Sequence, residues 1–145
     1  MQILVVDGPN LNLVGTREPS IYGSETLDAI HDRVRARAAE VGVAVAFFQS
    51  NHEGRIIDRL HERDFDGVVV NAGGLTHTSV ALRDALLGVA RPFVEVHLSD
   101  PSTREPFRSV NFLHDIAIAS VVGQGPRGYV LGLEAIVEHL RRVGA

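Results

Sequence analysis

Short apolar runs alternate with segments of helical period along the chain, and this alternation constrains the fold more than any other feature of the sequence. Strands that are apolar throughout, with helices between them, predict a parallel sheet covered on both faces. We therefore expect an α/β fold, a flavodoxin-like three-layer sandwich with a five-stranded parallel sheet of order 2-1-3-4-5. The predicted strands are rich in β-branched residues and bounded by turn residues; they are Gln2–Asp7, Val43–Gln49, Gly67–Asn71, Pro92–Leu98 and Ala117–Val122.

The segments between the strands carry apolar residues three or four positions apart, as amphipathic helices do. Ser50 and Glu53 form an S-x-x-E pattern, which predicts a capping box at the start of the second helix. Tyr129–Val143 is the last predicted helix. No internal repeat or shift of composition interrupts the 145 residues, so we expect one domain, residues 1–145. The helical periodicity rests on Leu27, Ile30, Val34 and Val41, on Ile56, Ile57 and Leu60, and on Val80, Ala81, Ala85, Leu86 and Val89.

All 14 basic residues are arginine, because the chain contains no lysine, and it contains no cysteine either. The missing lysine excludes a lysine imine, a lysine-bound pyridoxal phosphate and a Walker-type phosphate site. The missing cysteine excludes a thiol nucleophile, a disulfide framework and a thiolate metal site. Any catalysis must therefore use His, Tyr, Arg, Asn, Ser or carboxylate side chains.

The charge balance and the hydropathy pattern exclude two classes of partner. A net charge of −4 and a pI near 5.9 oppose binding to nucleic acid or to an anionic membrane surface. The longest apolar runs, Ile3–Val6 and Ile116–Val122, are too short to span a bilayer. We expect no nucleic-acid partner, no membrane partner and a cytoplasmic location.

The connection after the first strand, about residues 8–24, is far longer than the two to six residues usual at such a place. Long ordered loops in compact domains are usually functional, and this one carries Asn10, Asn12, Arg17 and Tyr22. Ligands of parallel sheets bind beyond the carboxyl ends of the strands, where this loop begins. We predict a lid, with an ordinary surface excursion as the alternative. It lacks the G-x-G-x-x-G spacing of a dinucleotide site.

Two further strand ends carry polar residues. Asn71 ends the third strand, and the Gly pair that follows leads to His77 through a segment that could bind an anion or form a simple tight turn. Glu95 and His97 lie two apart in the fourth strand and so share one face. A carboxylate beside an imidazole raises the pKa of the imidazole and suits it to donate a proton, although a purely structural pair has the same spacing. No metal-ligand spacing is present, so we expect no metal.

Other polar and aromatic residues carry weaker signals. Arg104 and Arg108 are four apart, a spacing that allows one of them to point back to the strand ends, but two solvated surface arginines are the commoner arrangement. Tyr129 is expected to be a core or cap residue. Three histidines in helical segments, His31, His61 and His139, are expected at the surface.

Taken together, the loop sequences resemble those of type II 3-dehydroquinate dehydratase, an enzyme of the shikimate pathway, over essentially the whole chain. The resemblance rests on four ordered motifs rather than on any one of them. They are Asp7-Gly-Pro-Asn-Leu-Asn-Leu with Gly15-Thr-Arg-Glu-Pro and Ile21-Tyr-Gly, then Gln49-Ser-Asn-His-Glu-Gly54, then Thr76-His-Thr-Ser-Val-Ala-Leu-Arg-Asp-Ala85, then Glu95-Val-His-Leu-Ser99.

The resemblance implies anti elimination of water from 3-dehydroquinate to give 3-dehydroshikimate through an enolate, without cofactor or metal. In that scheme Tyr22, as tyrosinate, removes a proton beside the ketone, and Arg17 lowers its pKa from the usual value of about 10. Asn12 would position the water that stabilises the enolate oxygen. His97, oriented by Glu95, would protonate the departing hydroxyl.

The resemblance also implies how the substrate is held. Asn71, His77 and Arg108 would bind the ring hydroxyls, and the backbone N–H groups of Leu98 and Ser99 would bind the carboxylate. Asp84 would reach the site from a neighbouring subunit, because family members form homododecamers built as tetramers of trimers.

Two departures from the family pattern keep alternatives open. Leu75 and Asp100 stand where the family usually has Tyr and Asn, so a drifted relative acting on another cyclic hydroxy-ketone acid is one alternative. A non-catalytic flavodoxin-like module that binds a small anion is another, but it would need neither the Tyr22 base nor its Arg17 activator. A biosynthetic role and a role in quinate breakdown would use the same site.

Overall fold

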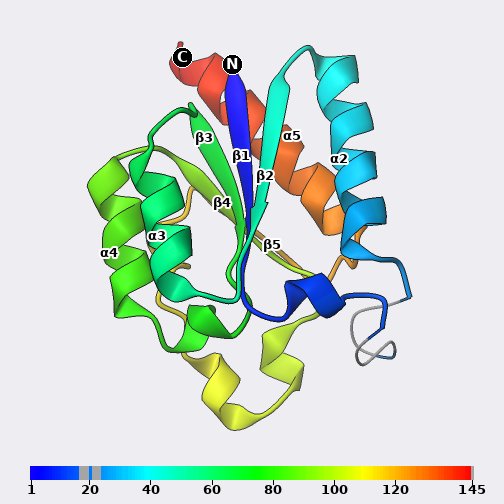
Figure 1. Ribbon diagram of the computed structural model, residues 1–145, viewed down its shortest axis with the longest axis vertical. Coiled ribbons are helices and arrows are strands. Elements are labelled where there is room, and N and C mark those ends of the chain that lie inside the picture. Colours follow the sequence, from blue (N-terminus) through cyan, green and yellow to red (C-terminus); the bar gives the residue numbers. More distant parts are fainter. Residues whose placement is uncertain (17–19, 21–23, 145) are drawn as a thin grey trace.

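A parallel sheet of five strands lies at the centre of the structure, a computed structural model that describes residues 1–16, 20 and 24–144 (Figure 1). The strand order is β2-β1-β3-β4-β5, as the sequence predicts. The ends of the strands differ from the prediction by at most two residues. The strands are β1 (Gln2–Asp7), β2 (Ala44–Gln49), β3 (Gly67–Asn71), β4 (Phe93–His97) and β5 (Ala119–Val122).

Helices cover both faces of the sheet and make the outer two layers of the sandwich. α2 (Leu27–Val41) and α5 (Arg127–Val143) pack together on one face. α3 (Glu53–His61) and α4 (Val80–Val89) pack together on the other (Figure 1). The predicted flavodoxin-like α/β fold is confirmed.

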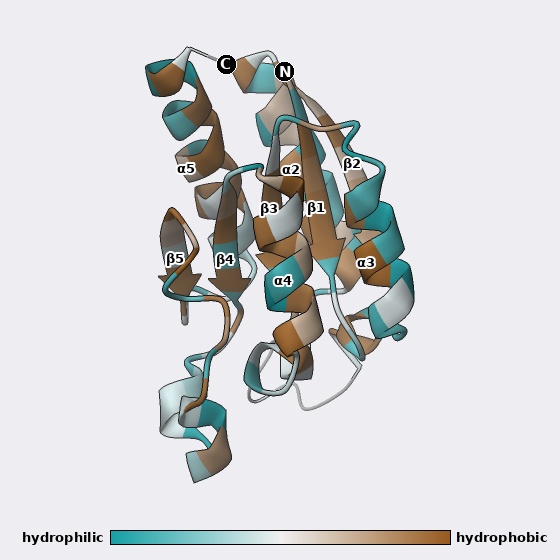
Figure 2. Ribbon diagram, turned by 90° about the vertical axis from the view of Figure 1, so that its left-hand side faces the viewer, coloured by the Kyte–Doolittle hydropathy of each residue, from teal (hydrophilic) through white to brown (hydrophobic). Residues whose placement is uncertain are grey.

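The central strand β1 shows why the strands are apolar throughout. Ile3 and Val5 are fully buried in the core under α2 and α5, whereas Leu4 and Val6 are buried in the core under α3 and α4. Successive side chains of a strand point to opposite faces, so a sheet covered on both sides needs apolar residues at every position. Figure 2 shows the apolar strands in brown, with helices that carry both hydrophilic and hydrophobic residues on either side of them.

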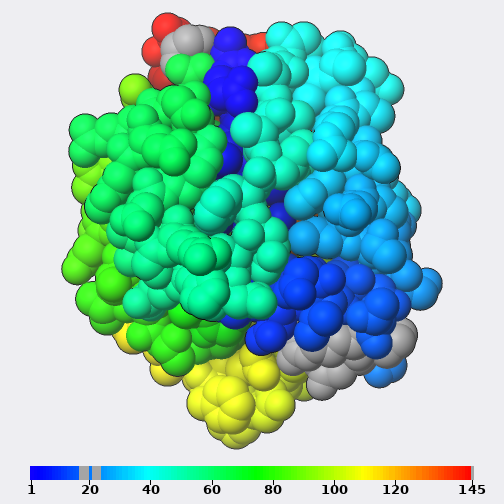
Figure 3. All heavy atoms as spheres, in the orientation of Figure 1, coloured from blue at the N-terminus to red at the C-terminus, as the bar shows by residue number. Residues whose placement is uncertain are grey.

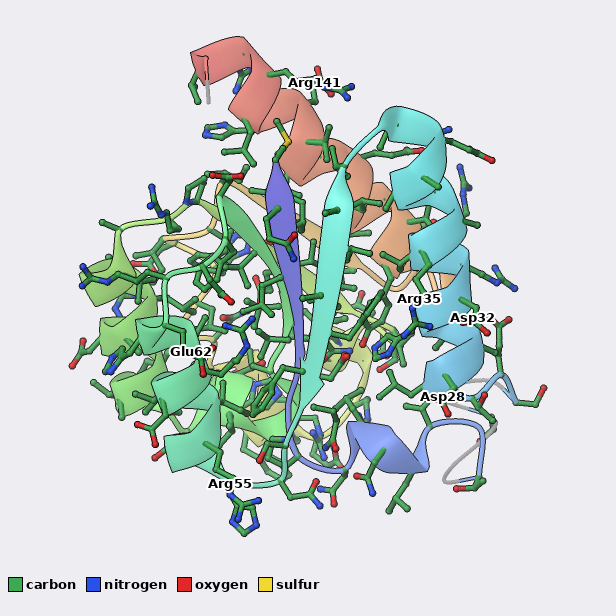
Figure 4. All side chains as sticks on the ribbon, turned by 45° about the horizontal axis from the view of Figure 1, so that its top comes forward. Asp28, Asp32, Arg35, Arg55, Glu62 and Arg141 are labelled. Atoms are coloured by element: carbon green, nitrogen blue, oxygen red, sulfur yellow. The ribbon has the colours of Figure 1, made fainter. Side chains whose placement is uncertain are left out.

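The helices carry charged side chains that are exposed to solvent, and the guanidinium of one of them, Arg35, also lies over the ring of Phe47, 4.6 Å from the ring centre (Figure 4). Those labelled there are all exposed: Asp28, Asp32 and Arg35 on α2, Arg55 and Glu62 at α3, and Arg141 on α5. This polar exterior agrees with the amphipathic spacing on which the helix predictions rest.

Side-chain caps start two of the helices, but the predicted capping box is wrong. Thr26 accepts a hydrogen bond from the backbone N–H of Ala29 at α2, and Ser79 caps α4 in the same way. α3 begins only at Glu53, so Ser50 lies too far before the first turn to reach its N–H groups. The Ser50 hydroxyl instead accepts a hydrogen bond from the N–H of His52 at 3.0 Å.

The first part of the predicted lid is anchored to the core. A short 3-10 helix, η1 (Leu11–Leu13), follows β1, and Leu11 and Val14 are buried under α2. Arg17 and Tyr22 lie outside the described residues. In the part of the chain that is described, no helix has both the length and the apolar character needed to cross a membrane.

Candidate active site

A pocket lies beyond the carboxyl ends of β1, β3 and β4, where the fold predicts a ligand site. Its walls come from the loop after β1, from η2 (Gly73–His77), and from the segment with η3 (Pro101–Thr103) and η4 (Pro106–Ser109). Figure 3 shows the blue loop and the yellow segment at the lower end of the molecule. The described lining residues are Pro9, Asn10, Leu11, Val14, Asn71, Gly73, Gly74, His77, His97, Leu98, Ser99, Pro101, Arg104 and Arg108.

The Glu95–His97 pair forms one wall of this pocket. Nε2 of His97 lies 2.5 Å from Oε1 of Glu95, and the two side chains are 7% and 1% exposed. His97 lines the pocket, and Glu95 lies behind it. The alternation of the strand places both side chains on the same face of β4.

Two further hydrogen bonds hold the Glu95 carboxylate. Nδ2 of Asn111 donates to Oε1 at 2.6 Å, and the hydroxyl of Ser120 on β5 donates to Oε2 at 2.8 Å. Burial alone would raise the pKa of Glu95, but the hydrogen bonds and the charge of His97 outweigh it and lower the pKa to about 2. Glu95 is therefore an anion beside the imidazole. The sequence does not predict these contacts, because Asn111 and Ser120 are 16 and 25 positions away from Glu95 and no local pattern links them to it.

His77 and two arginines also line the pocket. Nδ1 of His77 lies 2.6 Å from the carbonyl oxygen of Val110, and because a carbonyl only accepts, Nδ1 carries the proton. Nε2 of His77 is then available to a ligand. Nε of Arg108 donates to Glu105 at 2.5 Å. Arg104 and Arg108 both line the pocket, whereas their spacing alone favours solvated surface arginines and the family resemblance implies Arg108 only.

Asn71 lines the pocket at the end of β3, and a buried polar network stands behind it. The hydroxyl of Tyr129 accepts a hydrogen bond from Nδ2 of Asn71 at 2.8 Å and donates one to Asp7 at 2.5 Å. Nε2 of His31 contacts the other oxygen of Asp7 at 2.7 Å. Tyr129 is fully buried, as expected of a core residue. We call Asp7, His31, Tyr129 and Asn71 the Asp7 network.

The prediction that His31 lies at the surface is wrong. His31 is only 6% exposed, because it lies on the inner face of α2, where its ring stacks on Phe47 with the ring centres 4.2 Å apart. The buried carboxylate of Asp7 supplies the polar partner that makes this burial possible. The sequence feature that could have predicted this network is Asp7, a carboxylate at the end of an apolar central strand, which needs polar partners when it is buried.

The structure does not bring Asn12 into the pocket, because Asn12 is exposed in η1 and its neighbour Asn10 lines the wall instead. Asn10 has a φ of 70°, a left-handed conformation that Asn tolerates better than most residues. Its N–H donates to Oδ1 of Asn51 at 2.9 Å, and Nε2 of Gln49 donates to the carbonyl oxygen of Gly8 at 3.3 Å. The motif of residues 49–54 thus holds the loop that carries Asn10.

Gly8 fixes the start of this loop against η2. Its N–H donates to the carbonyl oxygen of Asn71 at 2.8 Å. A Cβ atom at Gly8 would lie 2.2 Å from the carbonyl oxygen of Ala72, so no larger residue fits without a backbone shift. This close approach brings the loop after β1 and the loop after β3 together around the pocket.

Two acidic residues named from the sequence lie away from the pocket wall. Asp84 is exposed on α4 and does not line the pocket. Asp100 caps η3, accepting hydrogen bonds from both the N–H and the hydroxyl of Ser102, and these bonds lower the pKa of Asp100. The hydrogen bonds from Ser102 thus hold its negative charge in the turn.

Among the described residues, no group of three or more His, Asp or Glu side chains is arranged to hold a metal ion. Leu98 and Ser99 line the pocket next to His97. The structure thus brings together His97, Asn71, His77, Leu98, Ser99 and Arg108 at one pocket, with Glu95 behind them.

The chain matches the model of the family described as "Dehydroquinase class II" over residues 1–137. It is 54% identical to a "3-dehydroquinate dehydratase" of Prochlorococcus marinus, with 99% of this chain and 100% of that protein covered. It is 50% identical to a "Catabolic 3-dehydroquinase 2" of Neosartorya fischeri, with 95% and 93% covered.

A solved structure agrees with the sequence comparisons. The crystal structure of type II dehydroquinase from Butyrivibrio crossotus superposes with a TM-score of 0.92 at 39% identity, covering 94% of this chain and 97% of that one. The family and the enzyme class predicted from the sequence are confirmed, and the chain belongs to the class II dehydroquinase family.

Proposed function

We propose that this chain removes water from 3-dehydroquinate to give 3-dehydroshikimate by anti elimination through an enolate, with Tyr22 as base and His97 as general acid. The observation that carries the proposal is the Glu95–His97 pair at the wall of a pocket in a chain of this family. Because the chain contains no lysine, an imine route is closed to it.

Tyr22, as tyrosinate, takes the proton from the carbon beside the ketone, and the electron pair moves to the ketone oxygen to form the enolate. Two tyrosines are present in the chain, and the other one, Tyr129, is unsuited to this task. Burial and the nearby Asp7 carboxylate raise the pKa of Tyr129 well above 10, so it keeps its proton. We assign the lowering of the pKa of Tyr22 to Arg17, five residues earlier in the same loop.

His97 completes the reaction. As the enolate collapses, the electron pair on its oxygen re-forms the C=O bond, and the pair of its C=C bond shifts to form the new C=C bond. The C–O bond of the leaving hydroxyl breaks, and His97 gives that oxygen a proton, so that water departs. Nε2 of His97 is engaged with Glu95 at 2.5 Å, which leaves Nδ1 to supply the proton. An anionic Glu95 supports the role of His97 as an acid, because the hydrogen bond between them holds the imidazole in one orientation.

Asn10, rather than Asn12, is our choice for the residue that positions the water at the enolate oxygen. Asn10 lines the pocket and Asn12 does not. An asparagine amide can donate to such a water as the oxygen gains negative charge.

The remaining lining residues hold the substrate. Asn71, His77 and Arg108 bind ring hydroxyls, and the backbone N–H groups of Leu98 and Ser99 bind the carboxylate. The guanidinium groups of Arg104 and Arg108 make the pocket favourable for an anionic substrate.

We further propose the homododecamer, a tetramer of trimers in which Asp84 completes the site of a neighbouring subunit. The exposed position of Asp84 supports this arrangement, as do Val80 and Leu87 on the same helix, each 52% exposed despite being apolar. Sedimentation of the purified protein measures its mass directly. The cytoplasmic location stays a prediction.

The test of the activity is the ultraviolet absorbance of the conjugated enone when purified protein meets 3-dehydroquinate. We expect turnover that resists borohydride and chelators, and its loss in Tyr22→Phe. Folded protein that gives no enone signal would contradict the dehydratase assignment. Full activity of Tyr22→Phe would contradict the base assignment alone.

A further inference from the structure

The Asp7 network has a fixed direction of hydrogen bonding, and the reason is the carboxylate at its buried end. An ionised carboxylate only accepts hydrogen bonds, so the Tyr129 hydroxyl, 2.5 Å from Oδ1 of Asp7, must donate its single proton there. The oxygen of Tyr129 can then only accept from its other partner. That partner is Nδ2 of Asn71, at 2.8 Å.

The opposite end of the Asn71 amide is fixed independently. The backbone N–H of Gly73 lies 3.2 Å from Oδ1 of Asn71, and an N–H group only donates. If the Asn71 amide were rotated by 180°, its NH₂ group would face the N–H of Gly73, and two donors would meet. Its oxygen would face the Tyr129 oxygen, whose only proton is already donated to Asp7. Both ends therefore select the same orientation.

Burial makes this selection strong. Asp7 and Tyr129 are 0% exposed and Asn71 is 4% exposed, so water has little access to replace a lost partner. The raised pKa of Tyr129 keeps its hydroxyl protonated, so the hydroxyl has a proton to donate to Asp7.

We infer that Asp7 and Tyr129 are positioning residues for the substrate: they fix the Asn71 amide so that its second N–H group, and not its oxygen, is the group presented to an oxygen atom of the ligand. This inference rests on the proposed function, because it gives Asn71 its direction within that site. It also assigns a role to two side chains that do not line the pocket.

The test compares the steady-state constants of four variants with those of the wild type. Tyr129→Phe removes the hydroxyl and should raise the KM for 3-dehydroquinate about tenfold, with kcat changed less than about threefold. Asp7→Ala should do the same although Tyr129 is intact, because the hydroxyl is then free to donate to Asn71. Asp7→Asn should keep the wild-type KM, because its side-chain oxygen still accepts from Tyr129 while its NH₂ group faces His31.

Thr76→Val is the matched control. The hydroxyl of Thr76 is buried and has no hydrogen-bond partner among the described residues, so its removal tests the loss of a buried hydroxyl by itself. We expect the KM of this variant to equal that of the wild type.

A double-mutant cycle with Asn71→Ala decides whether Tyr129 acts through Asn71. If it does, Tyr129→Phe raises KM in the wild-type background and has no effect on KM in the Asn71→Ala background. Equal effects in both backgrounds, or an unchanged KM in Tyr129→Phe, would overturn the inference.

A measurement that does not depend on enzyme activity, the exchange of side-chain protons with water, separates this inference from the proposed function. In the nitrogen-15 spectrum, the side-chain NH₂ protons of Asn71 should exchange with water more slowly in the wild type and in Asp7→Asn than in Tyr129→Phe and Asp7→Ala. An active wild type in which all four proteins exchange alike contradicts the inference only. An inactive wild type with the expected exchange pattern contradicts the proposed function only.

Discussion

Glu95 and His97 share a hydrogen bond of 2.5 Å on one face of β4, and the carboxylate end of that bond is almost completely buried. Three protein groups, His97, Asn111 and Ser120, donate to a single carboxylate. Such a carboxylate is a fixed negative charge, and its hydrogen bond sets the orientation of the imidazole.

Replacing Glu95 with Gln should therefore impair chemistry more than binding. The amide keeps the shape of the side chain but removes the negative charge beside the proposed general acid His97, so we expect kcat to fall about a hundredfold. KM should stay within about threefold. Steady-state kinetics measure both, with Glu134→Gln, a half-exposed partner of Arg37, as the control. An unchanged kcat in Glu95→Gln would exclude a role of the carboxylate in the acid step.

The same carboxylate should make stability depend on acid pH. The pKa of Glu95 falls from the ordinary 4.5 to about 2 in the folded protein. Its contribution to the free energy of unfolding, up to about 3 kcal/mol, is therefore complete above the ordinary pKa and is lost as the pH falls towards 2. Denaturant titrations between pH 7 and pH 2.5 should show a stability difference between wild type and Glu95→Gln that shrinks in acid. A constant difference across this range would refute the depressed pKa.

Arg17→Ala should move the pH profile of the rate. If the guanidinium stabilises the Tyr22 phenolate, its removal raises the pKa of Tyr22, and the rise of kcat that accompanies ionisation shifts to higher pH. Arg17→Lys keeps the charge and should shift the profile less. Arg55→Ala, on the exposed face of α3, is the control. A profile of Arg17→Ala that overlays the wild type would remove Arg17 from the activating role.

Asp84 offers a test of the assembly through activity. If Asp84 serves the site of a neighbouring subunit, Asp84→Ala and Tyr22→Phe are defective in different parts of a shared site. Proteins unfolded together and refolded as mixed oligomers should then regain activity, because some sites combine an intact Tyr22 with an intact Asp84. Each variant refolded alone is the control. Mixed oligomers no more active than the sum of the two controls would show that Asp84 acts within its own subunit or not at all.

Gly132 should be the glycine of α5 that cannot carry a side chain. A Cβ atom there would lie 2.8 Å from Cγ2 of Val96 and 3.2 Å from Cγ1 of Val69, so Gly132→Ala should overpack the interface between α5 and the sheet. We expect a loss of about 1–3 kcal/mol in the free energy of unfolding. Gly88→Ala on α4 is the control, because its Cβ would meet nothing within 4 Å. It should be neutral or stabilise the protein by up to about 1 kcal/mol, as denaturant unfolding would measure.

The sequence predicted the fold well because the signals are local and repeat. β1 is apolar at every position from Ile3 to Val6, and a strand buried on both faces requires this. The predicted capping box was wrong because the S-x-x-E pattern does not specify at which residue the helix begins, and α3 begins only at Glu53. The prediction that His31 lies at the surface was wrong because the apolar spacing of its helix does not depend on position 31. Only the packing of α2 against the end of β1 shows that His31 contacts the buried carboxylate of Asp7.

By itself, the sequence determined the layer order, the strand ends that bear the site and, through the missing lysine, a chemistry without an imine. Period and composition are properties of the chain alone, so they can be found without coordinates. Only the tertiary structure decided that Asn10 rather than Asn12 lines the pocket. The same holds for the contacts of Glu95 with Asn111 and Ser120 and for the control of Asn71 by Asp7 through Tyr129. These contacts join residues from 16 to 122 positions apart, and they exist because the packing of the sheet excludes water from the groups it brings together.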